Sequence, residues 1–171
     1  ISNCVFKDNT CRAVYSEYGN NIIEECQFTG NSSGTGPALF ATQGAGLTVK
    51  DCVFKNNVAN GTGGAVYVDR TPSTFQRCEI RGNAATSNGG GVLVTSNNWH
   101  VTLFENCMIA GNQSNNSYGG LYSADGSILD IRNSTIAFNL PASGYDLFAY
   151  GGLYMKNSIV KGRTYTRTDR T

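Results

Sequence analysis

The sequence has little charge and no long hydrophobic run. Charged residues make up 15% of the 171 positions, against roughly 25% in an ordinary soluble domain. Lys and Arg number 13 and Asp and Glu number 12, which gives a net charge of +1. We expect no nucleic-acid partner, because binding to nucleic acid requires a basic face. No apolar stretch approaches the ~18 residues of a membrane span, so we expect no such span.

Metal-binding residues are scarce as well. The chain has one His and no Cys-x-x-Cys pair, which are the usual ingredients of a structural metal site. We therefore expect no metal and no cofactor.

What the chain has in abundance is Gly, at 21 residues, and Asn, at 19, and both follow an internal repeat. A Cys or Ser recurs every 22 to 29 residues, and an Asn follows five residues after each of the first six. The first column contains Cys4, Cys26, Cys52, Cys78 and Cys107, and continues as Ser134 and Ser158. The second column contains Asn9, Asn31, Asn57, Asn83, Asn112 and Asn139.

Each repeat predicts three short strands. Alternating apolar residues form the first strand, and two polar residues then mark a corner just before the Cys. The second strand follows the Cys and contains Phe or Ile. After the Asn, a Gly-rich bend leads to the third strand. Such a unit cannot bury a face alone, but stacked copies can. The sequence therefore predicts an all-β fold, a right-handed parallel β-helix of about seven coils over residues 1–162, followed by a tail or cap over 163–171. A helical solenoid is disfavoured because the strands are short and rich in β-branched and aromatic residues.

The repeated columns have structural interpretations. Stacked inward Asn side chains form a hydrogen-bonded ladder that satisfies buried polar groups. The inward Cys column is favoured as a stack of free thiols rather than a chain of disulfides, because in-register side chains keep their Cβ atoms slightly too far apart. Cys11 lies outside this column, and we expect it to be accessible.

The repeat also resembles a known group of proteins. Segments such as Phe54-Lys55-Asn56-Asn57 and Gly63-Gly64-Ala65-Val66 are similar to the repeats of chlamydial polymorphic outer-membrane proteins and related bacterial surface-anchored proteins. These proteins belong to the pectin-lyase-like superfamily of right-handed β-helices. The resemblance implies the fold and an extracellular or cell-surface location, but it does not imply an activity.

Polysaccharide-cleaving members of that superfamily, as the resemblance implies, need clustered carboxylates on adjacent coils. Asp69 and Asp125 occupy similar coil positions but two coils apart, roughly 10 Å, so we expect no catalytic residue. For Asp146, which stands where other coils place Ala or Gly, we expect a turn or cap role. Other charged residues stack in columns of opposite sign: Asp51 with Arg77, Glu24 with Lys50, and Glu105 with Arg132.

One loop is a candidate binding site. Trp99 and His100 lie in the longest repeat, whose extra residues are expected to protrude, and loops on a rigid scaffold often carry binding residues. An exposed Trp can stack on a sugar ring. We predict carbohydrate or partner binding at Trp99, His100 and Tyr122, although Trp99 also fits a purely structural role as a cover over an edge of the core.

Five Asn-x-Ser/Thr sequences occur, and two of them, at Asn31 and Asn112, belong to the inward ladder. Asn60, Asn115 and Asn133 remain as candidate glycosylation sites in a eukaryotic source.

The sequence thus favours a non-enzymatic extracellular or cell-surface module that serves as a stalk, an adhesin or a fibre-forming segment. Its expected partners are further β-helix coils or identical subunits end to end, together with cell-surface glycans. The alternative is a carbohydrate-active enzyme, either a polysaccharide lyase or a glycoside hydrolase, or a sugar-binding module.

Overall fold

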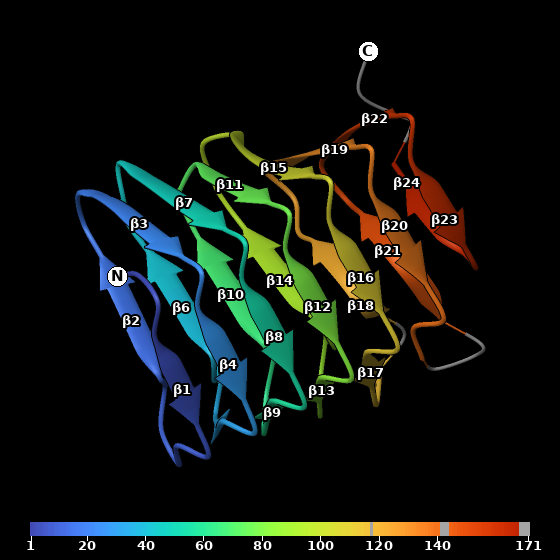
Figure 1. Ribbon diagram of the computed structural model, residues 1–171. Coiled ribbons are helices and arrows are strands. Elements are labelled where there is room, and N and C mark those ends of the chain that lie inside the picture. The colour runs from blue at the N-terminus through green and yellow to red at the C-terminus, as the bar shows by residue number, and fades with distance from the viewer. Residues whose placement is uncertain (117, 141–143, 168–171) are drawn as a thin grey trace.

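The computed structural model describes residues 1–116, 118–140 and 144–167. These residues wind into a parallel β-helix in which successive coils follow one another from the N-terminal to the C-terminal end (Figure 1). Every pairing between named strands is parallel and joins one coil to the next. No helix in this part of the chain is long and apolar enough to cross a membrane.

Three long sheets run along the rod, and each receives one strand from almost every coil. The β1–β23 sheet contains β1 (Val5–Lys7), β4 (Gln27–Thr29), β8 (Val53–Lys55), β12 (Glu79–Arg81), β16 (Met108–Ala110), β20 (Thr135–Ala137) and β23 (Ile159–Lys161). The β2–β24 sheet contains β2 (Val14–Glu17), β6 (Leu39–Thr42), β10 (Val66–Asp69), β14 (Val92–Thr95), β18 (Tyr118–Ser123), β21 (Tyr145–Ala149) and β24 (Thr164–Thr166). The β3–β22 sheet contains β3 (Asn20–Glu24), β7 (Gly46–Lys50), β11 (Ser73–Gln76), β15 (His100–Glu105), β19 (Ser127–Arg132) and β22 (Gly152–Lys156).

This architecture confirms the predicted parallel β-helix. The expected count of about seven coils matches roughly, since two of the sheets contain seven strands and the third contains six. The structure adds a fourth sheet of two-residue strands directly after the Asn column, in a segment where the sequence predicts a bend. Its members are β5 (Ser32–Ser33), β9 (Val58–Ala59), β13 (Ala84–Ala85) and β17 (Gln113–Ser114). Two residues are too few for an alternating pattern to be visible in sequence.

The repeat also continues past the expected boundary at residue 162. Thr164–Thr166 form β24, which pairs with β21 so that Tyr165 lies beside Phe148. Part of the segment assigned to the tail is therefore a strand of the helix, and residues 168–171 lie outside the described residues.

The predicted corner before each Cys or Ser has a specific backbone form. The residue just before each member of that column has a positive φ, between 48° and 55°: Asn3, Glu25, Asp51, Arg77, Asn106, Asn133 and Asn157. Asn and Asp tolerate the left-handed region better than other residues with a side chain, which explains the polar residues at this corner.

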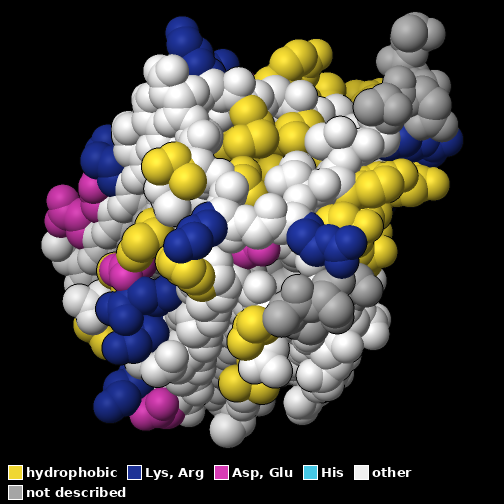
Figure 2. Space-filling view, turned by 90° about the vertical axis from the view of Figure 1, so that its right-hand side faces the viewer, with side chains coloured by type: hydrophobic (Ala, Val, Ile, Leu, Met, Phe, Trp, Pro, Cys, Tyr) yellow, Lys and Arg dark blue, Asp and Glu magenta, His cyan; other side chains and the backbone are white. Residues whose placement is uncertain are grey.

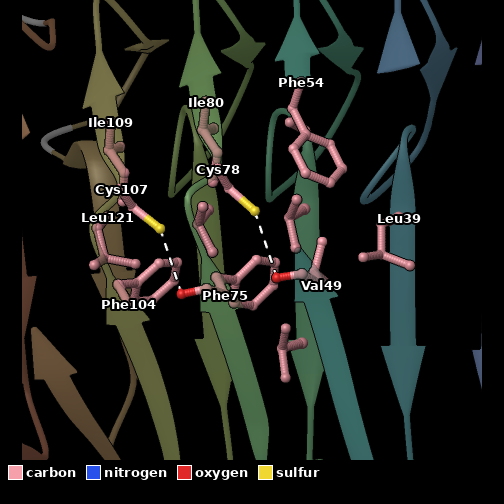
Figure 3. Close-up of a cluster of buried hydrophobic side chains, with 14 of the residues drawn as sticks. Leu39, Val49, Phe54, Phe75, Cys78, Ile80, Phe104, Cys107, Ile109 and Leu121 are labelled. Carbon is pink, nitrogen blue, oxygen red and sulfur yellow. Dashed lines mark hydrogen bonds between the residues drawn. The ribbon is translucent and has the colours of Figure 1, made fainter. Parts of the chain in front are cut away.

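Inside the rod, identical side chains stack on one another. Phe6, Phe28 and Phe54 have neighbouring ring centroids 4.8 Å apart and nearly parallel planes. Ile80 and Ile109 continue the column, while Phe75 and Phe104 stack 4.9 Å apart on the facing β3–β22 sheet (Figure 3). These side chains, apart from the terminal Phe6, have no exposed surface, so the core runs through the length of the helix.

Candidate functional site

The Asn column forms the predicted ladder, and its hydrogen bonds all run in one direction. The side-chain Nδ2 of each Asn donates to the Oδ1 of the next Asn, at 2.6 to 3.0 Å, from Asn9 to Asn139. The backbone N of each Asn donates to the same oxygen. From Asn31 onward, Nδ2 also donates to a main-chain carbonyl of the preceding coil. Each interior amide therefore makes four hydrogen bonds, which satisfies groups that would otherwise be buried without partners.

The ladder ends on Asp146 rather than on another Asn. The backbone N and Nδ2 of Asn139 donate to Asp146 Oδ1 at 2.8 and 3.2 Å. Only an acceptor is needed at the end of a one-way ladder, and a carboxylate supplies only acceptors. Gly162 leaves room for this carboxylate, because a Cβ at that position would lie 1.7 Å from Asp146 Oδ2. The expected cap role of Asp146 is confirmed, and its side chain reaches the ladder from β21.

All six Cys residues are free thiols, which agrees with the interpretation of the Cys column as a stack of free thiols. Within the column, Cys78 Sγ donates to Val49 O at 3.5 Å and Cys107 Sγ donates to Phe75 O at 3.4 Å (Figure 3). Ser134 Oγ makes the same kind of bond to Phe104 O at 3.3 Å. Ser can therefore replace Cys in the last two members of this column, because both offer a small side chain with a donor hydrogen.

Most of these thiols are shielded from solvent. Cys26, Cys52, Cys78 and Cys107 are each at most 4% exposed, whereas Cys11 is exposed as predicted. Desolvation raises the pKa of Cys52 to about 11, and only the thiolate is nucleophilic. The column therefore fits a structural role.

The outer face of the β2–β24 sheet carries a column of mostly aromatic side chains, which we call the tyrosine face. Its members share one register: Tyr15, Phe40, Tyr67, Leu93, Tyr122, Phe148 and Tyr165. Tyr118, Tyr145 and Tyr150 make ring contacts with this column. The apolar ring and polar tip of Tyr suit such an outer face.

On the tyrosine face the flat sides of the rings are already in use. Tyr15 and Phe40 stack at 5.4 Å, and Phe148 and Tyr165 at 4.3 Å, with interplanar angles of 8°. The Arg12 guanidinium lies 4.2 Å from the centroid of Phe40, a cation–π contact. This face therefore offers ring edges and hydroxyl groups rather than open ring faces.

A separate hollow lies beside Trp99, at the corner between the β2–β24 and β3–β22 sheets. Its volume is about 390 Å³. It is lined by Trp99, Ile128, Tyr150, Gly151, Gly152, Leu153, Tyr154, Thr166 and Arg167. A second hollow of about 300 Å³ touches Trp99 together with Ser96, Asn97, Asp125 and Gly126. We call the first of these the Trp99 hollow.

Hydrogen bonds within its own loop and to the next coil fix the backbone at Trp99. Its backbone N donates to Gly126 O at 2.8 Å, and Ser96 Oγ accepts hydrogen bonds from the N of Asn98 and the N of His100. The indole is 41% exposed, and Trp99 has a φ of 56°. A bulky residue in the left-handed region is strained, so the exposed indole is held there at a conformational cost.

The other two predicted site residues do not line the hollow. Tyr122 stacks on Tyr118 at 4.6 Å on the tyrosine face, where burial raises the pKa of its hydroxyl. His100 Nδ1 is buried and has no hydrogen-bond partner among the described residues. Whether Trp99, His100 and Tyr122 bind a ligand remains a prediction.

Sequence reasoning missed Tyr150, Tyr154 and Arg167. Tyr154 is an outward residue of β22, where alternation with Leu153 and Met155 signals its direction, and Tyr150 is followed directly by two Gly residues. These residues meet Trp99 through contacts between different coils, and the sequence pattern within one coil does not reveal such contacts.

Asp69, one of the two acids at similar coil positions, is engaged in local contacts. Asp69 accepts hydrogen bonds from Thr42, Thr95 and the adjacent Arg70. Burial of Asp69 opposes ionisation, but these hydrogen bonds outweigh it and lower the pKa of the carboxyl. Within the part of the chain that the structure describes, no three His, Cys, Asp or Glu side chains come close enough to hold a metal ion.

Of the three predicted charge columns, Glu24 with Lys50 and Glu105 with Arg132 lie side by side in the strand register, and Asp51 with Arg77 forms the predicted ion pair. Arg77 makes two bonds of 2.7 Å to Asp51, and this contact lowers the pKa of Asp51. Arg132 lies beside Glu105 in register but binds Asp130 instead, which stands two residues before it on the same face of β19. Glu105 accepts a bond from Gln76 Nε2.

The three candidate glycosylation residues are exposed, while Asn31 and Asn112 are fully buried. The exposed residues are Asn60, Asn115 and Asn133. Ser117, which completes the sequence at Asn115, lies outside the described residues. Attachment of a glycan at these positions stays a prediction.

Comparison with known proteins gives one match. A family model described as a right-handed β-helix region matches residues 1–107. No curated protein and no solved structure matches the chain.

Proposed function

The chain belongs to the right-handed β-helix family, and we propose that it is a non-enzymatic module of an extracellular or cell-surface protein, a rigid scaffold with an adhesive outer face. The observation that carries this proposal is the unbroken ladder from Asn9 to Asp146. It joins coils that three sheets already connect. Outward side chains are therefore held at the strand spacing of about 4.8 Å, which suits a surface that must present contacts at fixed positions.

The two ends of the rod support coil-to-coil assembly. Within the described residues, the outermost strands β1 and β2 at one end, and β22, β23 and β24 at the other, each have a strand partner on one side only. Met155 belongs to an inner column but is 40% exposed, and Figure 2 shows hydrophobic side chains uncovered between Lys and Arg at the C-terminal end. Open strand edges and uncovered core residues favour pairing with further strands. We propose that the strands that pair with these open edges belong to further β-helix coils or to identical subunits.

Labelling of intact cells tests the proposed location and role. Antibodies against the folded chain are applied to cells of the source organism before and after permeabilisation, and to the spent medium. We expect labelling of intact cells or recovery from the medium. Labelling that appears only after permeabilisation would contradict the proposal.

Sedimentation velocity tests the assembly of identical subunits. Met155→Lys places a charge on the end of the rod, whereas Ile159→Lys places the same charge on the outward side of β23, where the native side chain is 64% exposed. We expect association of the parent chain to rise with concentration, to be lost in Met155→Lys and to persist in Ile159→Lys. Equal association of the two variants would show that the end face is not the contact.

A further inference from the structure

The Trp99 hollow combines features that the tyrosine face lacks. Trp99 and Tyr154 are 41% and 65% exposed, and both line the hollow together with Tyr150. Gly151 and Gly152 also line it and carry no side chain that would fill the space. The volume of about 390 Å³ falls within the ~300–1,000 Å³ typical of small-ligand sites.

Among the described residues that line the hollow, Arg167 is the one that carries a charge, and its guanidinium lies 4.9 Å from the centroid of the Tyr150 ring. A guanidinium offers five N–H donors in a fixed plane, and a carboxylate matches that geometry in pairs. The ligand that fits has an apolar flat side for the aromatic rings and oxygen acceptors at its edge.

A sugar ring has this chemistry, since its C–H groups form an apolar side and its hydroxyl or carboxylate groups lie around the rim. We propose that the Trp99 hollow binds one ring of a glycan, with Trp99 as the stacking surface, and with Arg167 and the hydroxyls of Tyr150 and Tyr154 as hydrogen-bonding groups. This inference rests on the adhesive role proposed above and gives that role a site and a ligand class. The strained backbone of Trp99, with its φ of 56°, supports it independently, because strain of this kind is concentrated at functional positions.

Calorimetric titration of the purified chain tests this site. The probes are a neutral hexasaccharide of β-linked N-acetylglucosamine and an acidic hexasaccharide of uronic acid. Trp99 is the single Trp, so a change in intrinsic fluorescence reports on the site directly. We expect saturable binding of at least one probe with a matching change in Trp fluorescence.

Variants then locate the contact. Trp99→Ala is expected to weaken binding by about tenfold or more, as for a buried aromatic contact. Tyr18→Ala is the matched control, because Tyr18 is 61% exposed on the same corner but does not line the hollow, and we expect a change of less than about twofold. Arg167→Gln is expected to weaken binding of the acidic probe more than that of the neutral probe.

Each result decides the question. Saturable binding of either probe that Trp99→Ala weakens and Tyr18→Ala spares supports the proposal, and the probe that binds identifies a neutral or an acidic glycan. Absence of saturable binding of both probes, or equal affinity of Trp99→Ala and the parent chain, overturns it. If Trp99→Ala does not fold, Tyr154→Ala provides the same test. Failure here leaves the scaffold proposal standing, since the antibody experiment on intact cells tests that proposal separately.

Discussion

Removal of one interior amide of the ladder gives the sharpest energetic prediction. Asn83 is 1% exposed. Its Oδ1 accepts from the backbone N and Nδ2 of Asn57, and its Nδ2 donates to Phe54 O and to Asn112 Oδ1. Asn83→Ala removes these four buried hydrogen bonds. At about 1 kcal/mol for each bond, the free energy of unfolding should fall by roughly 4 kcal/mol, which corresponds to a drop of about 10 °C in Tm.

Asn9 provides the matched control at the end of the same ladder. Its side chain makes a single hydrogen bond, Nδ2 to Asn31 Oδ1, and it is partly exposed, while its backbone N keeps its bond in an Ala variant. Asn9→Ala should therefore cost about 1 kcal/mol or less. Asn83→Asp keeps the acceptor but places a carboxylate against Phe54 O and Asn112 Oδ1, so we expect it to be at least as destabilising as Asn83→Ala.

Urea denaturation, followed by circular dichroism and by Trp99 fluorescence, measures these differences. Coincident transitions from the two probes are required before a free energy is assigned, because the coils of a repeat protein can unfold separately. If Asn83→Ala and Asn9→Ala agree within about 1 kcal/mol, a value below the expected difference, the ladder does not stabilise the fold and the reasoning is refuted.

Three further outcomes follow from the same contacts. Cys11 should react with a thiol reagent at pH 8 within minutes in the folded chain, whereas Cys52, whose pKa burial raises to about 11, should react only after denaturation; rapid modification of Cys52 would contradict the buried column. Gly64→Ala should destabilise by ~3 kcal/mol or more from overpacking, because its Cβ would lie 1.9 Å from Gly90 O, and Gly34→Ala, with no atom within 4 Å, should be nearly neutral by thermal denaturation. Asp146→Ala should lower the Tm by more than Asp146→Asn, which keeps an acceptor for the last amide of the ladder; equal Tm values would contradict the end-of-ladder role.

The fold could be predicted because position within a coil fixes the environment of a side chain. Cys52 and Asn57 recur at their coil positions in other coils, and every copy points inward. Repetition of a residue type at one spacing is thus direct evidence for stacking. The two-residue strands were missed because a pattern of two residues has no visible period.

Contacts between different columns could not be predicted in this way. Asp146 joins the ladder from β21, seven residues after Asn139. The regular spacing of the repeat therefore does not predict its contact with the Asn column. The Trp99 hollow likewise joins Trp99 to Tyr154 and Arg167 from later coils. A strict repeat predicts which residues stack in one column, but it contains no information about contacts between side chains of different columns.

Native-state hydrogen exchange at the ladder amides tests the central claim most directly. The backbone N–H groups of Asn57, Asn83 and Asn112 donate to buried side-chain oxygens, so a rigid scaffold predicts that they exchange only through global unfolding. Their opening free energies should then match the free energy of unfolding from urea. In Asn83→Ala the amides at positions 83 and 112 keep their acceptors and should shift together, whereas the Asn57 amide loses its acceptor and should exchange faster. Exchange of these amides within minutes, by local opening at full global stability, would contradict both the ladder and the scaffold built on it.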